Sequence, residues 1–234
     1  MRSRLISLVF RIRVAGILLA GLSLWIFAEI AEEVLEQESH ALDVKILLAI
    51  RQIHNTWLDQ AMMGTTFIGD PAVLFVICLV MGIWLYRSHR RSEATTLGIA
   101  AIGAILLNYW LKQLFSRARP DLWERIIDVG DYSFPSGHAM VSLVIYGVIG
   151  YILTMRFPRH QKLITSLTVL LVIAIGFSRM YLGVHWPTDV AAGYAAGSVW
   201  LIACILSLRV WRKRRLRHKS NLEKESVSSI RSRN

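Results

Sequence analysis

Long runs of apolar residues, separated by short polar segments, form the dominant pattern of this chain. The runs lie at Val14–Ala31, Pro71–Tyr86, Ala94–Leu111, Ala139–Met155, Leu163–Phe177 and Val190–Leu208. A helix rises 1.5 Å per residue, so each run has about the length needed to cross a hydrocarbon core of ~30 Å. Inside lipid, backbone amides must bond within their own segment, as they do in a helix. The pattern therefore predicts an all-α integral membrane protein with six transmembrane helices.

The segment Glu32–Gly69, between the first two runs, is too polar to cross a membrane. Its apolar residues recur at three- to four-residue spacing, at Leu42, Ile46, Ile50, Ile53 and Trp57. This spacing places apolar side chains on one face of a helix. We expect an amphipathic helix that lies in the outer membrane interface, between spans one and two.

Composition strengthens the membrane interpretation and changes the meaning of the charge. The chain is 54% hydrophobic, whereas soluble domains are about 45–50% apolar. A net charge of +11 would suggest nucleic-acid binding in a soluble protein, but here the basic residues lie between and beyond the apolar runs. No nucleic-acid partner is therefore predicted. Cys78 and Cys204 lie inside runs, where small buried side chains are expected rather than a disulfide or a metal cluster.

The distribution of lysine and arginine predicts the orientation. With the N-terminus inside, 20 of the 27 basic residues lie on the inner side, as cytoplasmic loops favour. Both termini are thus predicted to be cytoplasmic. We expect a single membrane domain at residues 1–211, with its core at 71–209, and a basic, disordered cytoplasmic tail at 212–234, near anionic headgroups. A cleaved signal sequence is the alternative for the first run; no clear cleavage site follows it, and cleavage would not invert the later spans.

Charged and titratable residues gather on one predicted side of the membrane, which calls for an explanation. At the outer ends of spans three to six, or in the loops between them, lie Lys112, Arg119, His138, Arg179, His185 and Asp189. Three permanent cations around one point favour a multiply charged anion, and the planar fork of arginine suits phosphate oxygens. The arrangement predicts an extracytoplasmic phosphate site.

The residues around the two histidines indicate their chemistry. Ser136 is a plausible N-cap of span four and Gly137 allows a close approach of the backbone, so this helix start is a natural oxyanion site. Asp189 follows His185 by four residues and can fix its imidazole tautomer, which suits His185 to be a nucleophile. His138, beside the anion site, suits a general acid. The sequence has no H-E-x-x-H and no carboxylate cluster typical of metal sites, so no metal cofactor is predicted.

Three motifs within residues 112–189 match a known pattern. Lys112 to Pro120 reads K-x6-R-P, Pro135 to His138 reads P-S-G-H, and Ser178 to Asp189 reads S-R-x5-H-x3-D. Together they resemble the type 2 phosphatidic acid phosphatase superfamily, in its membrane-integral lipid phosphate phosphatase branch. Vanadium haloperoxidases and bacterial acid phosphatases also belong to this superfamily. No motif position departs from the pattern.

The resemblance implies a phosphate cradle. Lys112, Arg119 and Arg179 are expected to bind phosphate oxygens, with hydrogen bonds from Ser136 and Gly137.

The resemblance also implies a covalent mechanism without a cofactor. His185 is expected to form a phosphohistidine, Asp189 to support it, and His138 to protonate the leaving group. Water then releases phosphate.

The predicted function is hydrolysis of a lipid phosphate in the membrane, in a bacterial inner membrane by size and simplicity. Candidate substrates are phosphatidic acid, phosphatidylglycerophosphate, diacylglycerol pyrophosphate and undecaprenyl pyrophosphate, and the loop Asp121–Tyr132 is expected to influence the choice among them. A lipid-linked phosphotransferase shares the first half-reaction and stays open, as do a vanadate-dependent haloperoxidase and a non-enzymatic scaffold or transporter. The sequence does not indicate an oligomeric state.

Overall fold

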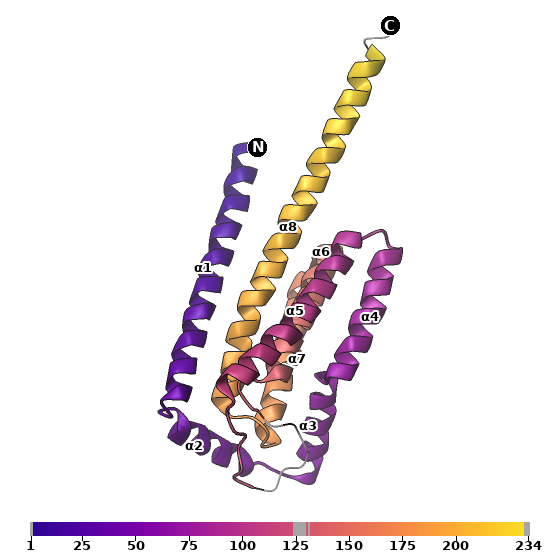
Figure 1. The fold of residues 1–234 in the computed structure, drawn as a ribbon. Coiled ribbons are helices and arrows are strands. Elements are labelled where there is room, and N and C mark those ends of the chain that lie inside the picture. The colour runs from indigo at the N-terminus through magenta and orange to yellow at the C-terminus, as the bar shows by residue number, and fades with distance from the viewer. Residues whose placement is uncertain (1, 124–129, 131, 232–234) are drawn as a thin grey trace.

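Helices account for nearly all of the described chain (Figure 1). The computed structural model describes residues 2–123, 130 and 132–231, with side chains at 13–123, 130 and 132–212. The elements are α1 (Arg2–Leu35), α2 (His40–Arg51), α3 (Thr56–Ile68), α4 (Pro71–Arg87), α5 (Arg91–Phe115), α6 (Gly137–Arg156), the short 3-10 helix η1 (Pro158–His160), α7 (Gln161–Tyr181) and α8 (Pro187–Arg231). None of the described residues forms a strand, and each predicted apolar run lies inside one of these helices.

Five helices are long and apolar enough to cross a membrane. They include segments Arg13–Leu35 of α1 and Pro187–Arg212 of α8, together with α5, α6 and α7. The predicted second span corresponds to α4, whose 17 residues extend only about 26 Å. Helices α3 and α4 pass the same test together, with a bend of 48° between them. The all-α membrane fold is thus confirmed with five or six spans, and the count of six stays a prediction.

The segment that we expected to form one amphipathic helix instead contains two, α2 and α3. Asn55 ends the connection between them because its side chain accepts a hydrogen bond from the backbone N–H of Leu58 at 2.9 Å and caps α3. Ile50 of α2 is buried, whereas Trp57, now on the other helix, is 76% exposed. The predicted apolar face is therefore divided, and its place in the membrane interface stays a prediction.

Close helix packing places α8 in the centre of the bundle, against α1, α5 and α6. Gly193 and Gly197 of α8 allow this approach. A Cβ atom at Gly193 would lie 2.8 Å from the carbonyl oxygen of Ser136, and one at Gly197 would lie 3.0 Å from that of Met140. The absence of side chains at these two positions thus allows α8 to pack against the start of α6.

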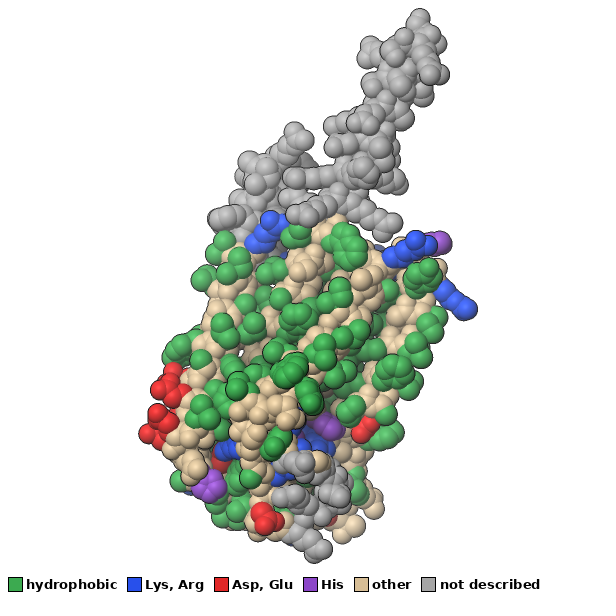
Figure 2. Space-filling view, in the orientation of Figure 1, with side chains coloured by type: hydrophobic (Ala, Val, Ile, Leu, Met, Phe, Trp, Pro, Cys, Tyr) green, Lys and Arg blue, Asp and Glu red, His purple; other side chains and the backbone are tan. Residues whose placement is uncertain are grey.

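The two ends of the bundle differ in character. The start of α1 and the end of α8 lie at one end, and α2, α3 and the connection from α5 to α6 lie at the other (Figure 1). Figure 2 shows a broad apolar band between them, Lys and Arg side chains at its upper edge, and a group of basic and histidine side chains in the lower part. Helix α8 continues without a break to Arg231; the division into residues 1–211 and a cytoplasmic tail stays a prediction.

Candidate active site

Four helix ends meet at the end of the bundle that contains α2 and α3. Lys112 lies in the last turn of α5 and Arg179 in the last turn of α7, while His138 and Asp189 lie in the first turns of α6 and α8. His185 lies in the short connection between α7 and α8. The structure therefore brings the predicted residues to one place, from stretches more than 70 residues apart in sequence.

His185 is held between a carboxylate and a guanidinium. Its Nδ1 lies 3.3 Å from Oδ2 of Asp189, and its Nε2 lies 3.3 Å from Nη1 of Arg119. The same Asp189 oxygen accepts a hydrogen bond from the backbone N–H of Trp186 at 2.8 Å, as the third residue of a helix does in a capping box. Asp189 is fully buried and His185 is 2% exposed, so the ring has a defined orientation with Nε2 facing the cation.

The three predicted phosphate-binding cations are anchored by neutral oxygen acceptors. Arg119 donates from Nη1 to the carbonyl of Val184 at 2.7 Å, and Lys112 donates to the carbonyl of Tyr132. Arg179 donates from Nη1 to Oγ1 of Thr66 at 2.6 Å. Arg179 is 2% exposed, and its Nε is buried without a hydrogen-bond partner among the described residues. A buried donor without a partner is costly, and an oxygen of a bound anion would supply the missing acceptor.

The start of α6 has the geometry of an anion site. Ser136 caps the helix, and its own backbone N–H donates to the carbonyl of Asp189 at 2.9 Å. A Cβ atom at Gly137 would lie 2.9 Å from Oδ1 of Asn108, so only glycine fits here without a shift. Asn108 in turn donates to the carbonyl of Pro135 at 3.2 Å, which fixes the turn before the helix.

His138 lies inside the same group. A Cβ atom at Gly69 would approach its ring carbon Cδ2 to 3.2 Å, so the break between α3 and α4 lies directly against this histidine. His138 interacts electrostatically with Arg179, His185, Arg119 and Lys112. His138 therefore lies close to the three predicted phosphate-binding cations and to His185.

The surroundings of His185 keep its imidazole neutral. Burial lowers its pKa well below the usual value, and the positive charges of Arg119, Arg179 and Lys112 lower it further. A neutral imidazole has the free electron pair that a nucleophile needs. The cations predicted to bind phosphate therefore also disfavour protonation of His185.

This shift predicts the acid side of the pH profile. An unperturbed histidine becomes protonated as the pH falls through about 6.5. Because the pKa of His185 is lowered in the folded protein, its nucleophilic form persists below that pH, and the fall of kcat/KM caused by its protonation occurs at a lower pH. We expect this in kcat/KM measured from pH 4 to 8 on two substrates whose phosphate groups ionise differently. If the pH at which kcat/KM falls on the acid side differs between the two substrates, the fall reflects ionisation of the substrate. If this pH is the same for both substrates and is 6.5 or higher, the prediction is contradicted.

Four residues that contact the site were not among the predicted ones. Thr66 and Asn108 hold Arg179 and the turn at Pro135, and Arg117 and Asp43 form ion pairs behind Asp189. Asp43 gave no distinctive sequence signal, because the same helix also contains His40, Lys45 and Arg51. The predicted specificity loop Asp121–Tyr132 lies largely outside the described residues.

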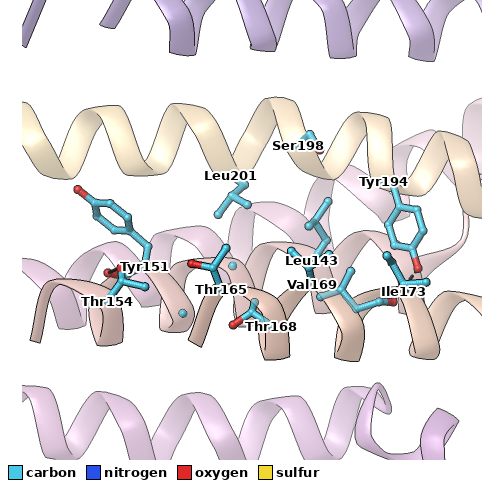
Figure 3. A pocket seen from close by; sticks show the side chains of 13 residues that line it. Leu143, Tyr151, Thr154, Thr165, Thr168, Val169, Ile173, Tyr194, Ser198 and Leu201 are labelled. Carbon is cyan, nitrogen blue, oxygen red and sulfur yellow. Dashed lines mark hydrogen bonds between the residues drawn. The ribbon is translucent and has the colours of Figure 1, made fainter. Parts of the chain in front are cut away.

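A separate groove of about 400 Å³ lies between α6, α7 and α8 (Figure 3). Apolar side chains such as Leu143, Val169 and Leu201 line it, with hydroxyls of Thr165 and Thr168. None of the predicted site residues contributes to its wall. Since the groove lies along membrane-spanning helices and lacks charged side chains, it is distinct from the phosphate site.

The donor set of the site is cationic rather than metal-binding. Within the described part of the chain, no group of three or more His, Cys, Asp or Glu side chains is placed to hold a metal ion.

Comparison with known proteins identifies the family of this chain. Residues 93–213 match the family model of the PAP2 superfamily. Phosphatidylglycerophosphatase B of Bacillus subtilis (strain 168) is 33% identical over 159 residues, which cover 66% of this chain and 77% of that protein. Undecaprenyl-diphosphatase BcrC of the same organism is 30% identical over 142 residues, 58% of this chain and 68% of that protein.

A solved structure extends the similarity to the fold. The crystal structure of a transmembrane PAP2 type phosphatidylglycerolphosphate phosphatase from Bacillus subtilis superposes with a TM-score of 0.76 at 26% identity. The superposition covers 83% of this chain and 96% of that one.

Proposed function

Because the chain belongs to the PAP2 superfamily of phosphatases, we propose that it hydrolyses a lipid phosphate through a phosphohistidine on His185. One observation carries the proposal: the buried dyad of His185 and Asp189 directs Nε2 at Arg119, 3.3 Å away. A phosphoryl group held by that guanidinium lies beside the nucleophile.

The first half-reaction transfers the phosphoryl group to the protein. Oxygens of the phosphate bind Lys112, Arg119 and Arg179, and Nε2 of His185 attacks phosphorus opposite the leaving oxygen. As the bond from phosphorus to that oxygen breaks, His138, whose protonated form is favoured by the negative charge of the bound phosphate, donates a proton to the leaving oxygen. Asp189 keeps the proton of His185 on Nδ1 and stabilises the positive charge that develops on the ring.

The second half-reaction restores the protein. His138, now without its proton, removes a proton from a water molecule that attacks phosphorus. The bond between phosphorus and Nε2 breaks, inorganic phosphate leaves, and both histidines return to their starting states. The cations stabilise the charge on the phosphoryl oxygens in both steps.

The substrate that we propose is a lipid with a terminal phosphomonoester or pyrophosphate. The site lies at one end of the bundle, where the ends of α5 and α7 meet the starts of α6 and α8, so a lipid can keep its tail in the membrane while its headgroup enters the site. Similar proteins named for phosphatidylglycerophosphate and undecaprenyl diphosphate make these two lipids the first to test.

The side of the membrane follows from charge. Lysine and arginine concentrate at the end of the bundle opposite the pocket, and cytoplasmic segments are the basic ones. We therefore propose that the chain lies in a bacterial inner membrane, with both termini on the cytoplasmic side and the phosphate site on the extracytoplasmic side.

The decisive experiment is phosphate release from a panel of lipids by the purified protein, with EDTA present throughout. We expect release from phosphatidylglycerophosphate, undecaprenyl pyrophosphate or phosphatidic acid, and none by His185→Ala. A strict need for magnesium would contradict the metal-free mechanism. Release only when an acceptor lipid is added, with phosphate recovered on that lipid, would identify a phosphotransferase.

Lys112 offers a test of the phosphate cradle. Vanadate mimics phosphate, so Lys112→Ala is expected to raise the vanadate concentration for half-inhibition about tenfold, as loss of a charge-assisted contact of about 1.5 kcal/mol would. The matched control is Lys45→Ala, since Lys45 lies exposed on α2 at the same end of the bundle. Equal inhibition of the two variants would remove Lys112 from the pocket.

A further inference from the structure

A buried carboxylate on α2 lies behind the catalytic dyad. Asp43 is fully buried although it lies on a short helix. A buried charge is tolerated only when it is paired and hydrogen-bonded. The partners of Asp43 therefore indicate the role of its side chain.

Within the described part of the chain, the side chain of Asp43 bonds to Arg117 and Thr188, which both contact or adjoin Asp189. Its Oδ2 lies 2.8 Å from Nη2 of Arg117 and accepts from Oγ1 of Thr188 at 2.6 Å. Its Oδ1 accepts from the backbone N–H of Thr188 at 3.0 Å. Asp43 thus binds the first turn of α8 at the residue next to Asp189.

Arg117 bridges the two carboxylates. Its Nη1 donates to Oδ1 of Asp189 at 2.7 Å and to Oγ1 of Thr188 at 2.8 Å, while Nη2 holds Asp43. Its Cζ lies 5.5 Å from the centroid of the Trp186 ring. The side chain of Arg117 is 14% exposed. The guanidinium is therefore fixed on several sides and has little freedom to leave Asp189.

From this network we infer that Arg117 and Asp43 are positioning residues for the reaction and that α2 is part of the active site. The inference rests on the proposed function. Arg117 occupies Oδ1 of Asp189, which leaves Oδ2 for Trp186 and for Nδ1 of His185. Asp43 in turn holds Arg117. The contacts run in the order His185, Asp189, Arg117, Asp43, so a single guanidinium holds both carboxylates and orients the imidazole through Asp189.

The expected consequences concern the chemical step. Arg117→Met leaves Asp189 free to rotate, and a misplacement of about 1 Å at a reacting group costs about 10²-fold in rate. We expect kcat to fall about 10²-fold with KM changed less than about threefold, because neither residue contacts the phosphate. Asp43→Asn replaces one acceptor with an NH₂ group that faces either Arg117 or the backbone N–H of Thr188, and we expect a fall in kcat of about tenfold.

A double-mutant cycle and a packing control separate positioning from simple stability. In the double variant the two losses should not multiply, since both act through the same contact to Asp189. Leu47→Ala is the control, because Leu47 is fully buried on the same helix and its apolar side chain, which packs in a cluster with Val184 and Trp186, forms no hydrogen bond or ion pair with the network. It is expected to lower the melting temperature and to keep kcat within about twofold.

The experiment uses the full chain in detergent micelles with phosphatidylglycerophosphate and records ¹⁵N spectra of labelled histidine, assigned with His185→Gln. Wild type should show the His185 proton on Nδ1; Arg117→Met and Asp43→Asn should reduce that tautomer, and Leu47→Ala should not. Equal losses of kcat in Leu47→Ala and Asp43→Asn, multiplying losses in the cycle, or an unchanged tautomer would overturn the inference. If wild type released no phosphate, the proposed function would be rejected. The spectra would still show separately whether Arg117 and Asp43 determine the tautomer of His185.

Discussion

Replacing His185 by alanine is expected to lower kcat by a factor of about 10³ or more, equivalent to a rise of about 4 kcal/mol in the activation free energy. The variant lacks the proposed nucleophile, so water would have to attack phosphorus directly, without a phosphohistidine intermediate. His138 is not expected to replace His185, because it lies in the first turn of α6 and not in the connection between α7 and α8. Phosphate release under saturating substrate measures the effect.

Two further measurements give that result its meaning. Brief incubation with ³²P-labelled lipid should label wild type at neutral pH and leave His185→Ala unlabelled. The control is His40→Ala, which removes an exposed histidine from the start of α2 and should keep both labelling and kcat. Turnover by His185→Ala within tenfold of wild type, with an unchanged melting temperature, would end the assignment of His185 as nucleophile.

The positions of the spans followed from the sequence because lipid imposes a strong, local rule. Every apolar run became a helix, since no other local structure satisfies the backbone there. The bend between α3 and α4 was a local feature too, although it was not predicted. Asp70 caps α4 by accepting from the N–H of Ala72 at 2.8 Å, and Pro71 begins the helix. What the sequence could not show is that Gly69 packs against Ile175 and His138, because that contact is tertiary.

The residues of the candidate site were likewise predictable only in part from the sequence. Cations and histidines at helix ends are conspicuous near a membrane, so their joint placement was predictable from topology. The network behind them was not, because Asp43 and Arg117 are 74 residues apart and either one alone resembles an ordinary surface charge. Their burial distinguishes these two residues from surface charges, and that burial depends on how α2 packs against α7 and α8. Sequence reasoning therefore identified the groups proposed to touch phosphate and missed those that aim them.

Asp189→Asn is expected to lower kcat about 10²- to 10⁴-fold. In wild type both oxygens of Asp189 accept hydrogen bonds, Oδ1 from Arg117 and Oδ2 from the N–H of Trp186. An asparagine has one amide oxygen and one NH₂ group, which only donates. Whichever way the side chain turns, one of these donors faces another donor.

Each orientation of the asparagine has a different consequence for His185. If the oxygen keeps Arg117, the NH₂ group faces Trp186 and Nδ1, and the ring must carry its proton on Nε2, where it cannot attack phosphorus. If the oxygen faces Nδ1, the NH₂ group meets Arg117 and the guanidinium is displaced. The ion pair with Arg117 favours the first orientation, because a charged donor makes the stronger bond. The loss should therefore appear in kcat, with vanadate inhibition preserved and the His185 proton found on Nε2. A variant with more than a tenth of wild-type kcat would show that Asp189 serves only as the cap of α8.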